Sequence, residues 1–330
     1  MTELDQLATS KQQLARLKNK IAERVVGHDK VVHCIVAALL AGGHVLLEGV
    51  PGLGKTLLVK TLSDALRLQF SRVQFTPDLM PADIIGTQIV MQDDSGARHF
   101  EFQPGPIFTQ LLLADEINRA TPKTQSALLE AMEENSVSVG RTIRTLDAPF
   151  MVLATQNPIE MEGTYPLPEA QLDRFMLKLT ADFPDIQELS TIVDRATGAP
   201  PPPLEPELDE VSLLALRTLV RDVVAAQHVK DYALRLVLAT HPHTDLANDA
   251  CRRFVRHGAS PRAALSLVLI AKAFAVMDGR MNISFDDINL AAPSVLAHRV
   301  LLNFEGEAEG IDPETLVGDI VTDTPEVLTS

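Results

Sequence analysis

The fold is decided by residues 49–56, which read Gly49-Val50-Pro51-Gly52-Leu53-Gly54-Lys55-Thr56 and fit the pattern G-x-x-x-x-G-K-[ST]. Glycines let a backbone wrap closely around phosphate groups with its N–H groups pointing inward. Lys55 would neutralise the β- and γ-phosphates, and the Thr56 hydroxyl would hold Mg²⁺. The helix that starts near Thr56 would add its positive amino end. The stretch therefore predicts a P-loop for a nucleoside triphosphate, in contrast to an ordinary Gly-rich turn.

Short apolar runs on both sides of this loop alternate with helical patterns. The runs are typical of buried parallel strands, because they are apolar on both faces, and they are His44–Gly49, Ser71–Phe75, Leu111–Glu116 and Phe150–Pro158. Helical patterns, for example Thr56–Leu66 and Pro122–Glu134, lie between them. The alternation predicts a doubly wound α/β sheet. A strand before residues 49–56 and a helix after them are the context that a P-loop requires.

Two adjacent acids, Asp115 and Glu116, end the apolar run that starts at Leu111. A buried strand that ends in two acids is costly unless the acids meet a cation. Asp115 fits a carboxylate that coordinates Mg²⁺ directly or through water, and Glu116 fits a group that polarises an attacking water. The pair points to hydrolysis rather than to transfer onto a bound acceptor. A helix-capping acid beside a solvated one is the alternative interpretation.

Three further residues gain meaning from the loop and the acids. Asn157 ends a strand pattern, where its amide would hold the γ-phosphate or a water, or would be an ordinary asparagine before a turn. Arg262 follows Ser260-Pro261 in the first turn of an expected helix, where a cation opposes the helix dipole by about 0.3–1 kcal/mol. A nearby nucleotide phosphate would offset that cost. Arg174 is by itself an arginine before an apolar segment.

A proline-rich stretch divides the chain, because proline at the density of Pro200-Pro201-Pro202-Pro203 continues neither a helix nor a central strand. We expect an α/β domain at residues 1–196, a linker at 197–208, an all-α domain at 209–304 and an acidic tail at 305–330. The structure of the tail stays open. The helical domain is indicated by three features: helical spacing over Val211–Gln227, a cap at Ser260 for a helix that Gly279 ends, and a capping box at Ser284 and Asp287.

The composition excludes several classes of protein. The chain has 330 residues, of which 46% are hydrophobic and 22% charged, so it can bury a sizeable core and is not mainly disordered. Its 29 Lys and Arg against 44 Asp and Glu give a net charge of −15, which disfavours coating of nucleic acid or of an anionic membrane.

Cys34 and Cys251 lie far apart without metal-ligand spacing, which indicates a reducing compartment. The charged stretch at residues 1–20 is not a signal peptide, and the apolar run Cys34–Ala41 is too short to span a bilayer, so we expect a cytoplasmic protein without an integral membrane segment.

The order of these motifs resembles the AAA+ ATPases, and specifically the MoxR family. The resemblance is carried by the P-loop and by LLLADEINRA at Leu111–Ala120, LATQNP at Leu153–Pro158, LPEAQLDRF at Leu167–Phe175 and GASPRA at Gly258–Ala263. It implies a P-loop parallel-sheet domain followed by a small helical lid, and an ATPase that uses ATP and Mg²⁺. It further implies that Asn157 is sensor 1, Arg262 is sensor 2 and Arg174 is the arginine finger, and that Val25, Val26 and Gly27 flank adenine.

The same resemblance extends to two inserted segments and to partners. Gln74–Thr87 and the hairpin pattern after it resemble the helix-2 insert, and Ser136–Leu146 resembles the pre-sensor-1 hairpin. The family implies a homo-oligomeric ring, expected to be a hexamer, that drives chaperone-like remodelling or maturation of protein complexes with a von Willebrand factor A domain partner. Four hairpin residues would face a ring pore and touch a protein client, or would be solvated charges: Arg98, His99, Arg141 and Arg144.

Other functions stay open at this point. Related AAA+ branches include nucleic-acid motors, which the acidic balance and the lack of an added DNA-binding module disfavour. A nucleotide-gated scaffold would bind ATP without needing Glu116, Asn157 or Arg174. A small-molecule P-loop kinase would leave Arg174 and Arg262 without a purpose. Hydrolysis that drives remodelling is therefore the favoured interpretation.

Overall fold

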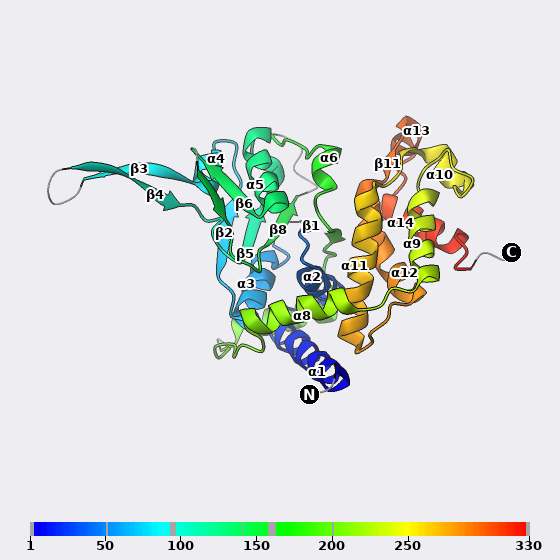
Figure 1. Ribbon diagram of the computed structural model, residues 1–330, viewed down its shortest axis with the longest axis horizontal. Coiled ribbons are helices and arrows are strands. Elements are labelled where there is room, and N and C mark those ends of the chain that lie inside the picture. The colour runs from blue at the N-terminus through cyan, green and yellow to red at the C-terminus, as the bar shows by residue number, and fades with distance from the viewer. Residues whose placement is uncertain are drawn as a thin grey trace.

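The computed structural model describes residues 3–50, 52–92, 97–140, 142–157, 163–199 and 201–327. Its centre is a parallel sheet of five strands in the order β2-β5-β8-β1-β9 (Figure 1). The strands are β1 (Val45–Glu48), β2 (Phe70–Gln74), β5 (Leu111–Asp115), β8 (Met151–Gln156) and β9 (Leu177–Thr180). The four strands expected from the apolar runs are confirmed, and β9 adds a fifth beside β1.

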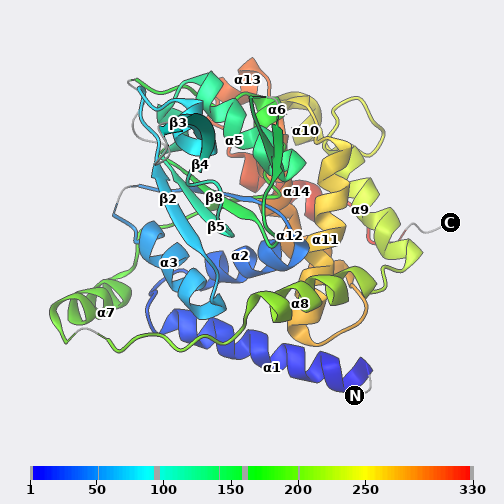
Figure 2. The ribbon, with the colours of Figure 1, turned by 60° about the vertical axis from the view of Figure 1, so that its left-hand side comes forward.

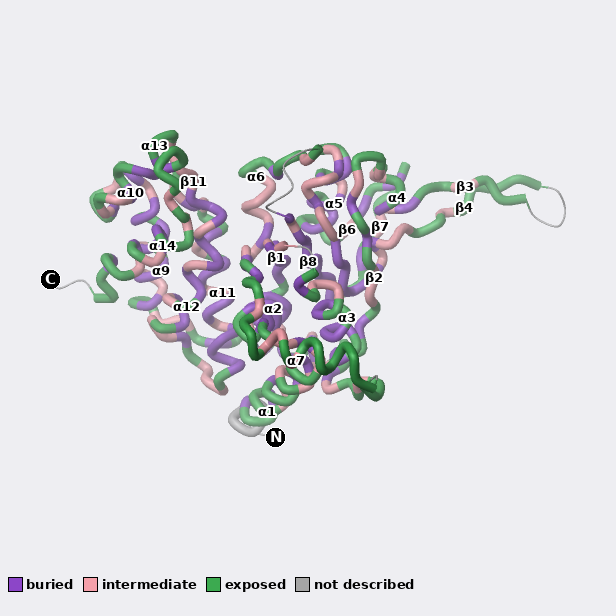
Figure 3. The backbone as a smooth tube through the Cα atoms, turned by 180° about the vertical axis from the view of Figure 1, so that it is seen from behind, coloured by how far each residue is buried: buried purple, intermediate pink, exposed green. Residues whose placement is uncertain are grey.

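Successive residues of the central strands enter two different apolar cores, because side chains alternate between the faces of a sheet. Leu111 and Leu113 pack in the core that α1, α2 and α3 line, whereas Leu112 and Ala114 pack in the core that α5 lines. Both sets are fully buried, as the purple central strands of Figure 3 show. The helices beside the sheet are α2 (Asp29–Ala41), α3 (Lys55–Leu66) and α5 (Pro122–Glu134), and α1 (Glu3–Ala22) packs on α2 and α3. The expected α/β layering is confirmed.

Two antiparallel hairpins interrupt the β-α alternation. The first, β3 (Gly86–Gln92) with β4 (Arg98–Pro104), follows the short helix α4 (Pro81–Ile85) and projects far from the body of the molecule (Figure 1). Gly86 at its base has a φ of 89°, and a Cβ there would lie 2.4 Å from the carbonyl oxygen of Gln103. The second hairpin, β6 (Ser136–Val139) with β7 (Thr142–Thr145), follows α5. Both expected hairpins are present.

The helical domain begins after an extended connector at residues 201–208. The pattern at Val211–Gln227 is helical only as far as Asp222, because Val224 leaves the helix and exchanges backbone hydrogen bonds with Met281 and Ile283, and a new helix begins at Gln227. The cap at Ser260, the end at Gly279 and the capping box of Ser284 and Asp287 are confirmed. The elements are α8 (Glu210–Asp222), α9 (Gln227–Ala239), α10 (Asp249–Phe254), β10 (Val255–His257), α11 (Pro261–Asp278), α12 (Phe285–Leu296), η2 (Ala297–Arg299) and β11 (Leu301–Leu302).

The segment after Phe304 is helical, a point that the sequence leaves open. It forms α13 (Phe304–Ala308) and α14 (Pro313–Asp323), and α14 packs against α12 through its buried Leu316, Val317 and Ile320. At the other end of the chain, α1 contacts both α3 and α11, so it runs beneath the two domains (Figure 2). The short elements α6 (Glu169–Leu172) and η1 (Ile117–Arg119) and the helix α7 (Ile186–Thr197) complete the fold.

Candidate functional site

The glycine-rich loop joins β1 to α3 at the carboxyl end of β1. Gly52 and Gly54 have φ values of 88° and 75°, and a Cβ at either position would meet no atom within 4 Å. Glycine is therefore required by the backbone conformation and not by packing. Pro51 lies outside the described residues. The Lys55 ammonium donates a hydrogen bond to the Gly49 carbonyl oxygen at 2.6 Å. Burial lowers the pKa of Lys55, and the Asp115 and Glu116 carboxylates oppose that shift.

The two acids lie at the carboxyl end of β5 and share one partner on β8. The Thr155 hydroxyl donates to Asp115 Oδ1 at 2.6 Å, and it accepts the backbone N–H of Glu116 at 2.8 Å. Glu116 has a φ of 56°, which turns the chain sharply at the end of the strand. Thr155 is fully buried, so from the next strand of the sheet it fixes the Asp115 carboxylate relative to the backbone of Glu116.

Three polar residues that the motifs do not single out contact these acids. Arg72 Nη2 lies 2.7 Å from Asp115 Oδ2, Gln74 Nε2 donates to Glu116 Oε2 at 2.7 Å, and Arg119 Nη1 lies 3.0 Å from Glu116 Oε2. Arg72 and Gln74 are on β2, which pairs with β5 in a register that places Gln74 opposite Asp115. Arg72 and Gln74 could be assigned to this site only from the strand order, which the sequence alone does not reveal.

Asn157 immediately follows β8 and is 5% exposed. Because β8 lies between β5 and β1 in the sheet, Asn157 follows the strand that separates the acids from the P-loop. The structure therefore brings Asn157, Asp115, Glu116 and the loop to one edge of the sheet. This is the edge where parallel α/β sheets bind their ligands.

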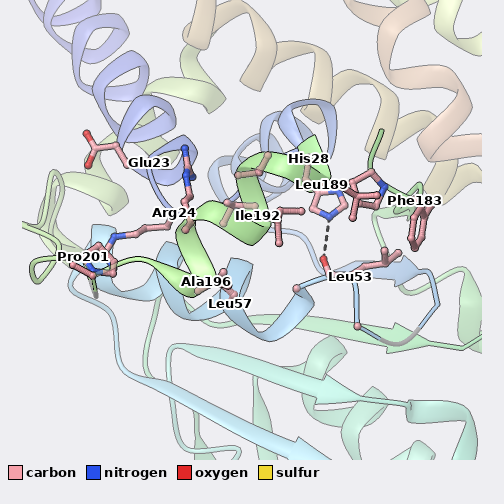
Figure 4. A pocket seen from close by; sticks show the side chains of 17 residues that line it. Glu23, Arg24, His28, Leu53, Leu57, Phe183, Leu189, Ile192, Ala196 and Pro201 are labelled. Carbon is pink, nitrogen blue, oxygen red and sulfur yellow. Dashed lines mark hydrogen bonds between the residues drawn. The ribbon is translucent and has the colours of Figure 1, made fainter. Parts of the chain in front are cut away.

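A pocket of about 640 Å³ opens beside the P-loop (Figure 4). Of the three residues that the resemblance places beside adenine, Val25 and Val26 line this pocket, whereas Gly27 follows them and lies close to the Glu188 carboxylate. His28 Nε2 and the Leu53 carbonyl oxygen, 3.0 Å apart, connect the segment before α2 to the loop. The opposite wall comes from Phe183 and from α7, whose apolar residues the motifs do not identify: Leu189, Ile192 and Ala196. The amphipathic pattern of α7 could have identified these residues from the sequence. In the structure no residue of α7 is buried, so its apolar face lines the pocket and does not pack in the core.

These residues fit ATP with Mg²⁺. The pocket has the size of a small-ligand site, and apolar side chains form walls suited to a base. Thr56 is the second residue of α3, and Asp115 is the carboxylate at the end of β5, one strand beyond β8 in the sheet. Within the described ranges, no cluster of three or more His, Cys, Asp or Glu side chains is placed to hold a metal ion. Magnesium suits such a site, since it is usually held by one or two carboxylates together with substrate phosphates and water.

The two candidate arginines lie together at the other end of β1. Arg174 Nη2 lies 3.0 Å from Glu133 Oε2, and Arg262 contacts the other oxygen of the same carboxylate. Both arginines line a pocket of about 320 Å³ with His44, the residue that precedes β1. The P-loop follows β1, and a strand of four residues rises about 13 Å. The structure therefore brings Arg174 to Arg262, and it brings neither arginine to the P-loop of its own chain.

Of the four hairpin residues, two are exposed to solvent and one, Arg144, packs on an aromatic side chain. Arg98 and His99 are exposed on β4. The Arg144 guanidinium lies 3.8 Å from the centre of the Phe102 ring, so the second hairpin packs on the first. Arg141 lies outside the described residues.

Comparisons with known proteins agree with this geometry. Residues 44–177 match the ATPase family associated with various cellular activities (AAA), and residues 247–320 match the AAA lid domain. The chain is 43% identical to the uncharacterized protein YeaC of Bacillus subtilis over 94% of this chain and 93% of that protein. It is 42% identical to the chaperone MoxR1 of Mycobacterium tuberculosis over 96% of this chain and 82% of that protein. The crystal structure of a candidate ATPase from Cytophaga hutchinsonii superposes with a TM-score of 0.91 at 39% identity, covering 97% of each chain.

Among the described helices, none is both long enough and apolar enough to cross a membrane. The P-loop and the paired acids at the end of β5 lie within the matched AAA region, and most of the helical lid lies within the matched lid region. The chain belongs to the MoxR family of AAA+ ATPases.

Proposed function

We propose that this chain hydrolyses ATP to ADP and phosphate in the presence of Mg²⁺ and uses the free energy to remodel or mature protein complexes. The observation that carries the proposal is the pair Asp115 and Glu116, joined through Thr155 at the same sheet edge as the P-loop. A carboxylate for a cation and a second one for a water are what hydrolysis needs, and binding alone needs only the first.

Each residue has a separate task in this proposal. Glycine-loop N–H groups and Lys55 hold the phosphates, and Val25, Val26 and Gly27 lie beside the adenine. Thr56 and Asp115 hold the metal ion, and bound Mg²⁺ would neutralise charge on the phosphate oxygens. Glu116 accepts a proton from the attacking water, and Asn157 orients that water or the γ-phosphate. Gln74 and Arg119, which bind Glu116 in this structure, release it for that task.

The second part of the proposal concerns a second copy of the chain. Arg174 and Arg262 lie at the opposite end of β1 from the P-loop, so they are placed to serve the nucleotide of a neighbour in a ring. Because the family resemblance implies a ring, we expect a hexamer. We also expect the protein to be cytoplasmic.

The remodelling role comes from the relatives and from the exposed hairpins. One relative is named a chaperone, and the β3–β4 hairpin carries exposed Val90, Met91 and Phe100 far from the body. These side chains are suited to contact with a protein client. A protein with a von Willebrand factor A domain is the expected partner.

Phosphate release by the purified chain, with and without Mg²⁺, tests the activity. Glu116→Gln is the matched variant, because the amide is nearly isosteric and cannot accept the proton of the water. We expect Mg²⁺-dependent turnover in the wild type, and ATP binding without turnover in the variant. Equal turnover in both chains contradicts the role of Glu116, and binding without turnover in the wild type favours the scaffold. Turnover that rises only with added single- or double-stranded DNA at physiological salt favours the nucleic-acid motor.

A further inference from the structure

Arg299, the last residue of η2 in the lid, has a side chain that is only 2% exposed. Its guanidinium makes five hydrogen bonds, which is the number of N–H groups that it has to donate. Four acceptors are in residues 173–176: Asp173 Oδ1 at 2.7 Å and the carbonyl oxygens of Asp173, Phe175 and Met176 at 3.0, 2.8 and 3.3 Å. The fifth is the carbonyl oxygen of Val295 at 2.5 Å. One lid side chain therefore holds the backbone on both sides of Arg174.

Other lid residues hold the same segment. The Ser260 hydroxyl lies 2.9 Å from each carboxylate oxygen of Asp173, and His298 Nε2 lies 3.0 Å from the Phe175 carbonyl oxygen. Arg256 Nη2 lies 2.6 Å from Glu169 in α6, which precedes the segment. These contacts come from β10, the start of α11 and η2, so the lid and the backbone that carries Arg174 are attached at several points.

The side chain of Arg174 itself has looser support. It is 29% exposed and contacts only α5, through Glu133 and the Leu129 carbonyl oxygen at 2.8 Å, among the contacts that the structure describes for it. Its direction therefore depends on where its backbone is held. A buried guanidinium with all donors satisfied holds a segment stiffly, because its planar fork has fixed directions.

We propose that Arg299 is a positioning residue for Arg174, so that the lid of one chain determines the arginine that is presented to the nucleotide of the neighbouring chain. The inference rests on the proposed role of Arg174 in a neighbour's site. In this arrangement a movement of the lid changes hydrolysis in the next subunit.

The test is Arg299→Lys, which keeps the charge and loses the five-donor fork. A displacement of a catalytic group by about 1 Å costs on the order of 10²-fold in rate. We therefore expect kcat for ATP to fall about 100-fold, with KM for ATP and far-UV circular dichroism unchanged. If Arg299→Lys does not fold, Asp173→Asn replaces it, since the amide keeps the size of the side chain and an acceptor for Arg299. It is expected to lose about 10-fold in kcat.

Mixed assemblies distinguish positioning from damage. Arg299→Lys and Lys55→Ala chains carry different tags, are coexpressed, and are purified on both tags in turn. An Arg299→Lys chain has an intact P-loop and would receive Arg174 from a Lys55→Ala neighbour, whose lid is intact, so we expect turnover to return. A chain damaged within its own fold would stay inactive beside any neighbour.

The matched control is Arg280→Lys. Arg280 also binds a buried aspartate: its Nη1 and Nη2 donate to Asp287 Oδ2 and Oδ1 at 2.8 and 2.6 Å. Both residues of this pair lie within the lid. We expect its turnover to stay within about twofold of the wild type. The inference is overturned if doubly tagged assemblies show no return of activity, if none form, or if Arg280→Lys loses as much as Arg299→Lys. An inactive wild type overturns the proposed function instead, and full turnover of Arg299→Lys with an active wild type overturns this inference alone.

Discussion

The ammonium of Lys55 donates a hydrogen bond to the carbonyl oxygen of Gly49 at 2.6 Å, so the lysine closes over its own loop. This contact lies within the loop and supports no core residue. We expect Lys55→Ala to lose nucleotide binding, because phosphate loses its cation, while the fold is retained. A hydrogen bond from a charged group is worth about 1.5–3 kcal/mol, less than the roughly 5–15 kcal/mol that stabilise a folded protein. Titration with a fluorescent ATP analogue measures the binding, and a variant that binds as tightly as the wild type would remove the P-loop assignment.

Arg72 competes for the carboxylate that we assign to the metal ion. It lies 2.7 Å from Asp115 Oδ2 and is 46% exposed, and such exposed pairs contribute about 0.2–1 kcal/mol. Without this competitor, Arg72→Met should reach half-maximal hydrolysis at a Mg²⁺ concentration lower by up to about fivefold. Arg253→Met is the control, since Arg253 makes its ion pairs with Glu305 and Glu309 in the lid. An unchanged or higher requirement for Mg²⁺ in Arg72→Met would contradict the competition.

Arg174→Ala should bind ATP normally and hydrolyse it very poorly. An arginine that offsets developing charge on the γ-phosphate is worth about 10³–10⁵ in rate. If Arg174 acts on a neighbour, mixing this variant with Lys55→Ala should restore activity, because an intact P-loop then meets an intact arginine. Phosphate release by assemblies that contain both chains is the measurement. No restored activity in such assemblies refutes action on the neighbour, and full activity of Arg174→Ala alone makes it a surface arginine.

Arg262 should behave as Arg174 does in the same mixing experiment. The two arginines contact one carboxylate, Glu133, so they face the same neighbour. We expect Arg262→Ala to lose turnover and to regain it beside Lys55→Ala. Thermal melting without nucleotide gives the control, since a cation in the first turn adds nothing favourable to helix stability. A fall of several degrees in Tm with unchanged turnover would make Arg262 structural.

Stability should fall on mild acidification because of His44. Its Nδ1 accepts the Val152 N–H at 2.9 Å, and burial lowers its pKa from 6.5 to about 4. The unfolded chain therefore takes up a proton first. The contribution of His44 is complete above pH 6.5 and is lost as the pH falls towards 4, which amounts to about 2 kcal/mol at pH 5.

Urea unfolding at pH 7 and pH 5 measures this loss, and His44→Gln is the comparison because glutamine does not titrate. His33 and His298, whose pKa values burial also lowers, are present in both chains and cancel in the difference. The variant should lose less stability between the two pH values than the wild type. Equal losses would show that folding does not lower the pKa of His44.

The sequence by itself determined the local chemistry of this protein. The P-loop pattern needs closely spaced glycines followed by Lys55, and the strand that starts at Leu111 ends in the two acids. The caps at Ser260 and Ser284 use residues three or fewer apart. Each of these depends on neighbours along the chain, which is why the parallel sheet and most of the helical domain could be predicted from local patterns, whereas the two hairpins were expected only from the family resemblance. The fifth strand and the helices after Phe304 could not, because their few apolar residues become core only when β1 and α12 lie beside them.

Only the tertiary structure decided how distant residues meet. Arg72 and Gln74 reach the acids because β2 is paired with β5, although β3 and β4 lie between them in the chain. The wall that α7 adds to the pocket and the meeting of Arg174 with Arg262 at Glu133 have the same origin. The physical reason is that a side chain specifies what it can bond, whereas strand order and domain packing specify which partner comes within reach.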